Sequence, residues 1–85
     1  MTNAEFDVLD ELYFLQSYKS LIQALKMNDT ELTSTLEILL NRGWIKGYLS
    51  PQEEKELDIS ELEKEYWNYH YLATKAGLLA HNSNF

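Results

Sequence analysis

The chain has 85 residues, which is enough for one domain with one small core. Its hydrophobic fraction of 45% is that of an ordinary globular protein, and the lack of cysteine excludes disulfides, thiolate metal sites and a cysteine nucleophile. Fourteen acidic residues against seven basic ones give a net charge of −7, which argues against a general polyanion binder.

The first eleven residues, MTNAEFDVLDE, are acidic and polar and lack the basic and apolar regions of a secretory signal. No apolar run approaches the roughly 20 residues that a helix needs to cross a bilayer. We therefore expect a soluble, cytoplasmic protein without a membrane partner.

Two stretches near the N-terminus show the apolar spacing of helices. Residues 4–15 carry a wide apolar arc, which predicts a helix that is buried on more than one side. Ser17 is a suitable N-cap for a second helix over residues 18–26. The first arc joins two stripes: Phe6, Leu9 and Tyr13, and beside them Val8, Leu12 and Leu15.

A third helix is predicted over residues 29–42. Asn28 followed three positions later by Glu31 forms a capping box, and Gly43 is the expected residue just after the end of a helix. The core side of this helix is a single stripe of leucines: Leu32, Leu36, Leu39 and Leu40.

Two strands are predicted in the C-terminal half. Residues 44–50, WIKGYLS, and residues 66–72, YWNYHYL, are rich in aromatic and β-branched residues, and an antiparallel ribbon of the two would pack one face on the helices. In the second strand, alternation places Trp67, Tyr69 and Tyr71 on one side. Thr74 then caps a short helix that we expect over residues 74–81.

The segment between the strands, residues 51–65, holds most of the net charge. Seven acidic residues against two lysines give it a charge of −5, which is typical of a solvated loop. Within it, Leu57, Ile59 and Leu62 are apolar residues among acids. They form either a docking segment for a basic partner or a cover over the surface of the domain itself, and the sequence leaves both interpretations open.

This order of elements resembles the winged helix-turn-helix domains of bacterial transcription regulators. The resemblance rests on the turn LKMN at 25–28, the leucine stripe, the RGWI run at 42–45 and the YLATKAG run at 71–77, and it covers roughly residues 5–80. It implies an α+β fold, mainly α, with a three-helix core, a two-stranded antiparallel wing and a short C-terminal helix.

In that family the third helix enters the major groove of DNA and the wing touches the backbone. The resemblance therefore assigns recognition to the exposed side of the helix at 29–42. Its positions are Thr30, Thr33, Ser34, Glu37, Asn41 and Arg42.

The residue types at these positions favour a protein partner over DNA. Contacts with phosphates need lysine or arginine, but this helix has neither before Arg42, while Glu37 and the acidic wing would face a polyanion. We therefore expect a protein-interaction or accessory factor in transcription control. A small dimeric, sequence-specific DNA-binding regulator is the alternative.

The secondary recognition positions comprise basic residues near the turn and the first strand, together with two apolar residues of the acidic segment. Under the alternative function, these basic residues would make the backbone contacts. A homodimer through helix 4–15 or the ribbon is a further expectation, because that helix has more apolar surface than so small a core needs. The secondary positions are Lys19, Lys26, Lys46, Leu57 and Ile59.

The sequence does not favour an enzyme, a cofactor or a metal. His70 and His81 stand eleven positions apart, which is not the spacing of a metal-binding pair. The glycine-rich phosphate-binding motifs and the nucleophile elbow are both missing from the sequence. We therefore expect a non-catalytic protein without catalytic, cofactor-binding or metal-binding residues.

Overall fold

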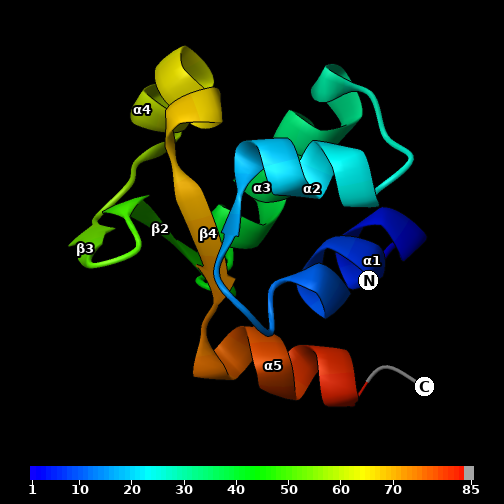
Figure 1. Cartoon of the computed structure of the whole chain (residues 1–85). Coiled ribbons are helices and arrows are strands. Elements are labelled where there is room, and N and C mark those ends of the chain that lie inside the picture. The colour runs from blue at the N-terminus through cyan, green and yellow to red at the C-terminus, as the bar shows by residue number, and fades with distance from the viewer. Residues whose placement is uncertain (84–85) are drawn as a thin grey trace.

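The computed structural model describes residues 1–83, and the last two positions of the predicted domain, 84 and 85, lie outside the described residues. Helices and an antiparallel sheet combine into an α+β fold (Figure 1). The elements in chain order are α1 (Asn3–Glu11), β1 (Gln16–Ser17), α2 (Tyr18–Ala24), α3 (Asp29–Asn41), β2 (Ile45–Ser50), β3 (Glu53–Lys55), α4 (Ile59–Glu65), the 3-10 turn η1 (Tyr66–Asn68), β4 (His70–Ala73) and α5 (Lys75–Asn82).

The sheet of the described chain has the strand order β1-β4-β2-β3, so the predicted two-stranded ribbon is wrong in its extent. β4 pairs with β1, where Gln16 stands opposite Tyr71, and with β2, where Gly47 stands opposite the same tyrosine. β2 and β3 form a hairpin. The last strand in the sequence therefore lies in the interior of the sheet and joins β1 to β2.

The helices surround this sheet on several sides. In Figure 1, β4 runs from α4 at the top to α5 at the bottom, and α1, α2 and α3 lie to its right. The core between them is made largely of leucines from the helices together with Tyr71 of β4. The largest fully buried side chains are Val8, Leu9, Leu12, Leu21, Leu32, Leu36, Leu39, Leu62 and Tyr71.

The capping predictions for α3 are confirmed. The Asn28 side chain accepts a hydrogen bond from the N–H of Glu31 at 2.8 Å. At the other end Gly43 has a φ of 71°, and its N–H and that of Trp44 donate to carbonyl groups of the last turn. Glycine is the residue that adopts this left-handed conformation at no steric cost.

The caps of the two flanking helices are confirmed as well. The Ser17 hydroxyl accepts from the N–H of Ser20 at the start of α2, at 3.1 Å. The Thr74 hydroxyl accepts from the N–H of Gly77 at the start of α5, at 3.2 Å. Both helices begin within one residue of the predicted position.

The first helix is shorter than predicted, because α1 ends at Glu11 rather than at residue 15. The backbone after it turns towards the sheet: the carbonyl of Leu12 accepts from the N–H of Ala73 at 2.9 Å, and β1 follows. These pairings with β4 take up the backbone groups that a longer helix would use. Phe14, within the predicted helix, is instead 77% exposed.

The second predicted strand begins later than expected. Tyr66 to Asn68 form η1, and β4 starts at His70. The turn is held because the Tyr71 hydroxyl donates to the carbonyl of Tyr66 at 2.7 Å. Alternation is right for Tyr69 and Tyr71, which are buried, and wrong for Trp67, which is 55% exposed.

The acidic segment is not a loop, and this prediction is wrong. It contains β3 and the seven-residue helix α4. The Asp58 side chain caps α4 by accepting from the N–H of Glu61 at 2.8 Å. Leu62 on α4 is fully buried, so the segment supplies part of the core despite its charge.

The wide apolar arc near the N-terminus serves the core of the chain itself. Val8 and Leu12 are fully buried and Leu15 is half-buried, whereas Phe14 of the same predicted helix stays exposed. A homodimer through this segment stays a prediction. Separately, none of the helices in the described part of the chain has both the length and the apolar character needed to span a bilayer.

Candidate interaction surface

The predicted recognition positions on α3 lie on one side of the helix but differ in exposure. Thr30, Ser34 and Asn41 are exposed, whereas Thr33 and Glu37 are half-buried. The Thr33 hydroxyl donates back to the carbonyls of the preceding turn, at 2.7 Å and 3.2 Å, and so is already occupied. The middle of the predicted face is therefore partly covered.

The element that covers it is α4, from the acidic segment. α4 packs against α3, and the buried Leu62 anchors it there. Its first turn is tied to the hairpin by an ion pair between Lys55 Nζ and Glu61 Oε2 at 2.7 Å. The acidic segment is thus fixed beside the predicted recognition helix.

A hollow of about 350 Å³ lies between α3 and α4. Glu37 enters it from α3 and Glu63 from α4, so two carboxylates share one small space. Burial raises the pKa of Glu37, and the negative charge of Glu63 and hydrogen bonding with it raise this pKa further. The residues lining the hollow are Thr33, Ser34, Glu37, Leu62, Glu63 and Tyr66.

Aromatic rings close one end of this surface. The ring of Tyr66 stands edge-on to Trp67 and to Tyr18 of α2, with centroids 4.9 Å apart in each pair. The Tyr18 hydroxyl donates to Asp29 at the start of α3. Trp67 stays 55% exposed and is linked to the hollow through its contact with Tyr66.

Arg42, which the sequence assigned to recognition, is engaged inside the protein. It forms an ion pair with Glu5 of α1, whose side chain is 4% exposed, and its guanidinium lies 4.9 Å from the centroid of the Trp44 ring. The other oxygen of Glu5 accepts from the Thr2 hydroxyl at 3.0 Å. Arg42 therefore ties the end of α3 to the start of α1.

Replacing Arg42 by methionine is expected to lower the free energy of unfolding by about 2 kcal/mol at neutral pH, because a buried carboxylate loses its cation. Burial alone would raise the pKa of Glu5. The hydrogen bonds from Thr2 and Arg42 and the charge of Arg42 outweigh it and hold this pKa below the ordinary 4.5. The stabilisation is therefore full above pH 4.5 and is lost as the pH falls through the lowered pKa.

Urea unfolding of both proteins at neutral pH and at about pH 3 measures this effect. The difference between wild type and Arg42→Met should shrink at the lower pH. Lys75→Met, at an exposed position of α5, is the matched control and should change little. An equal loss at both pH values would show that the ion pair is not the cause.

The secondary basic residues lie in two settings. Lys46 Nζ is 3.1 Å from Glu54 Oε1 on β3, and its hydrogen bond with Glu54 raises the pKa of Lys46. Lys19 and Lys26 are exposed and form no ion pair within residues 1–83. The predicted basic patch is thereby reduced to two lysines of the helix-turn region.

The apolar residues of the acidic segment act as a cover on the surface of the domain itself. Leu57 packs against the core and lies directly on Gly47, where a Cβ atom would come within 2.1 Å of its side chain. Ile59, the first residue of α4, is half-buried. The structure thus favours the second of the two interpretations that the sequence left open.

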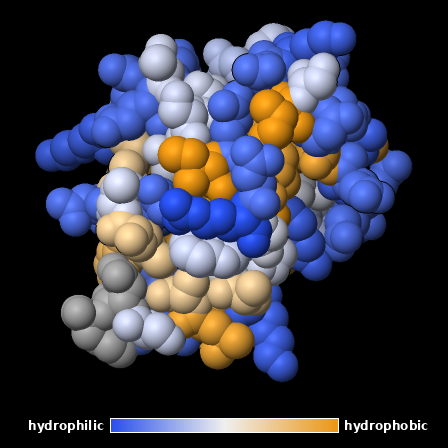
Figure 2. All heavy atoms as spheres, turned by 180° about the vertical axis from the view of Figure 1, so that it is seen from behind, coloured by the Kyte–Doolittle hydropathy of each residue, from blue (hydrophilic) through white to orange (hydrophobic). Residues whose placement is uncertain are grey.

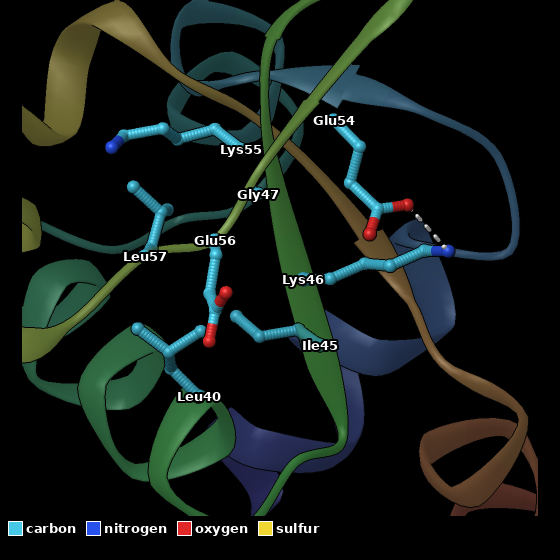
Figure 3. Close-up of a pocket in the computed structure, with 8 residues that line it drawn as sticks. All are labelled: Leu40, Ile45, Lys46, Gly47, Glu54, Lys55, Glu56 and Leu57. Carbon is cyan, nitrogen blue, oxygen red and sulfur yellow. Dashed lines mark ion pairs between the residues drawn. The ribbon is translucent and has the colours of Figure 1, made fainter.

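A second hollow, of about 250 Å³, lies between the β2–β3 hairpin and the end of α3. Figure 3 shows that Leu57 and Leu40 line it on one side and that Lys46 points to Glu54 on the other. The two lysines that line it, Lys46 and Lys55, are thus already paired within the chain, with Glu54 and Glu61. This hollow belongs to the packing of the hairpin and its connection.

The two histidines lie far apart in the fold. His81 of α5 stacks on Phe6 of α1 with ring centroids 4.1 Å apart, and its Nδ1 lies 2.8 Å from the Tyr13 hydroxyl. His70 is a half-buried residue of β4. Within residues 1–83 no three His, Cys, Asp or Glu side chains are grouped so that they could hold a metal ion.

Sequence reasoning missed Glu63, Tyr66 and Trp67 as parts of this surface. The signal was present: Asp58 followed by Glu61 is a capping box, and Leu62 and Tyr66 follow at helical spacing. Because residues 51–65 are so rich in charged side chains, this helical pattern was interpreted as a solvated loop.

No family model, no curated protein and no solved structure matches this chain.

Proposed function

We propose that this chain is a non-catalytic winged-helix recognition module that binds another protein, as an accessory factor in transcription control. In this proposal, α3 and α4 together form the surface for the partner. The single observation that carries it is the position of α4, which lies along the α3 face that would otherwise face DNA.

The width of the major groove explains why the position of α4 argues against DNA binding through α3. A helix with its side chains is about 10–12 Å across, and the major groove is about 12 Å wide, so the groove holds one helix. With α4 beside the positions of Thr33, Ser34 and Glu37, a pair of packed helices would have to enter. Glu63 would then face the phosphates, at a cost in energy.

The winged-helix assignment draws support from the order of the elements. α2 and α3 are joined by the four residues 25–28, and β2 follows the glycine at the end of α3. β4 returns antiparallel to β2, and Thr74 caps α5. In this assignment β3 and α4 form an elaborated wing that folds back on the third helix.

A DNA-binding regulator is the second candidate. The observation that favours it is that Lys19 and Lys26 on the helix-turn region are exposed, as are Thr30 and Asn41 at the two ends of the α3 face. In this case α4 has to move away from α3 on binding.

Fluorescence anisotropy of a labelled random-sequence DNA duplex distinguishes the two functions. We expect no binding tighter than about 10⁻⁴ M even at low salt, because α3 is covered and the chain carries a charge of −7. Binding that weakens steeply with salt and that Lys26→Glu abolishes would overturn the proposed function. Lys75→Glu, on α5, is the control for a mere change in net charge.

A further inference from the structure

The hollow between α3 and α4 presents two carboxylates without a cation. Glu37 and Glu63 take part in none of the ion pairs formed within residues 1–83. The chain pairs other acidic side chains of the same segment, since Glu54 bonds to Lys46 and Glu61 to Lys55. Two ionised carboxylates in one small hollow repel each other, and a cation bound to both would remove the repulsion.

The remaining walls of the hollow suit the stem of a long side chain. Leu62 and Tyr66 supply apolar surface, and the hollow of about 350 Å³ is open to solvent at both helices, where Ser34 of α3 and Glu63 of α4 are exposed. An arginine combines an apolar stem with a planar group that donates to carboxylates on both sides and stacks on aromatic rings.

The aromatic end of the hollow is an observation independent of the carboxylates. Trp67 is 55% exposed although its ring contacts Tyr66, which lines the hollow. At the centres of protein interfaces, tryptophan, tyrosine and arginine contribute most of the binding energy. The surface is therefore complementary to a basic segment of a protein.

We propose that the hollow between α3 and α4 is a socket for an arginine side chain of a partner protein. The carboxylates of Glu37 and Glu63, which lie together in the hollow, both accept from the guanidinium. Tyr66 contacts its stem, and Trp67 contacts neighbouring residues of the partner. This inference rests on the proposed function and names the chemistry of the partner.

Other occupants of the hollow fit its chemistry less well. Calcium takes six to eight oxygen ligands, whereas the hollow offers two carboxylates and the hydroxyls of Thr33 and Ser34, of which the first already bonds within α3. Nucleic acid brings negative charge to two glutamates. A lysine is a compact point charge and does not bridge two carboxylates in a plane.

The test is an NMR titration of the ¹⁵N-labelled chain with arginine amide and, in parallel, with citrulline amide, its neutral isostere. We expect arginine amide to shift the amide signals of residues 33–37 and 62–67 in a saturable way. Citrulline amide should bind at least about tenfold more weakly, because it has no charge to place between the carboxylates.

Variants assign the binding to the two glutamates. Glu37→Gln and Glu63→Gln are each expected to weaken arginine amide at least about fivefold, whereas Glu53→Gln, on the exposed strand β3, should bind as the wild type does. Glu37→Gln should leave the melting temperature unchanged or raise it, because it removes a like-charge contact. A merely structural role for Glu37 would lower both stability and binding.

Several outcomes overturn the inference. They are equal shifts with arginine and citrulline amide, shifts spread over all acidic residues, an unaffected Glu63→Gln variant, or calcium chloride binding at the same residues with higher affinity than arginine amide. If any of these appears while DNA does not bind, only the arginine socket is wrong. If DNA binds with a steep salt dependence, the proposed protein-binding function itself is wrong.

Discussion

Gly77→Ala is expected to lower the free energy of unfolding by at least about 3 kcal/mol. A Cβ atom at this position of α5 would lie 2.0 Å from the carbonyl oxygen of Trp44 and 2.9 Å from its carbon. Both are backbone atoms of Trp44, the residue just before β2, and cannot turn aside as a side chain could. The alanine variant can therefore be accommodated only if α5 moves away from Trp44. This movement would disturb the bond from the Thr74 N–H to the same carbonyl, which is 2.9 Å long.

Helix propensity alone would predict that Gly77→Ala stabilises the protein, whereas the contact with Trp44 predicts that it destabilises it. In an unhindered helix, alanine is favoured over glycine by up to about 1 kcal/mol. Urea unfolding followed by circular dichroism measures the difference, and Leu79→Ala, 57% exposed on the same helix, should stay within about 0.5 kcal/mol of wild type. A stabilised Gly77→Ala protein would show that α5 does not approach Trp44 this closely.

Leu62→Ala should destabilise the protein by about 3 kcal/mol, although this leucine lies within the most acidic stretch of the chain. Its side chain is fully buried, so the substitution leaves a cavity between α4 and the core. The effect tests whether the acidic segment is folded, since a leucine in a solvated loop would contribute almost nothing.

Hydrogen exchange provides a second readout for this substitution. Amides of α4 are expected to be protected in the wild type and to lose protection in Leu62→Ala, ahead of those in α3. Ile59→Ala, at a half-buried position of the same helix, is the matched control and should cost about 1 kcal/mol. A loss in Leu62→Ala no larger than in this control would contradict the packing of α4 on α3.

Local signals predicted much of the helical part of the fold. The caps Ser17, Asn28 and Thr74 are bonds between residues three positions apart, and Gly43 ends α3 through its own backbone conformation. Such interactions are written in short stretches of sequence and can be recognised there.

The sheet depended on contacts that a local pattern does not contain. β1 is two residues long and exists because β4 pairs with it, so nothing around Gln16 marks it as a strand. The high charge of residues 51–65 led to the prediction of a loop where the structure has α4. This helix is stabilised by Leu62, which is buried against α3. These elements are determined by tertiary packing, which overrides local preference.

In the candidate site, too, local spacing was predictable from the sequence and tertiary contacts were not. Thr30, Thr33, Ser34 and Glu37 were placed correctly on one side of a helix, because spacing fixes a helical face. Whether that face is open depends on α4, and the partner of Arg42 is Glu5, 37 positions away in the chain. The spacing of these residues therefore predicted a helical face but not what lies beside it.

The interior position of β4 determines when the sheet can form during synthesis. Gln16 and Tyr71 face each other across more than fifty residues of chain, so β1 has no partner until β4, residues 70–73, has been synthesised. Until then β1 and β2 have no strand between them, while α2 and α3 can already form from local contacts. The β2–β3 hairpin is likewise local, whereas a chain that stops before residue 70 leaves β1 and one edge of β2 without the strand that joins them.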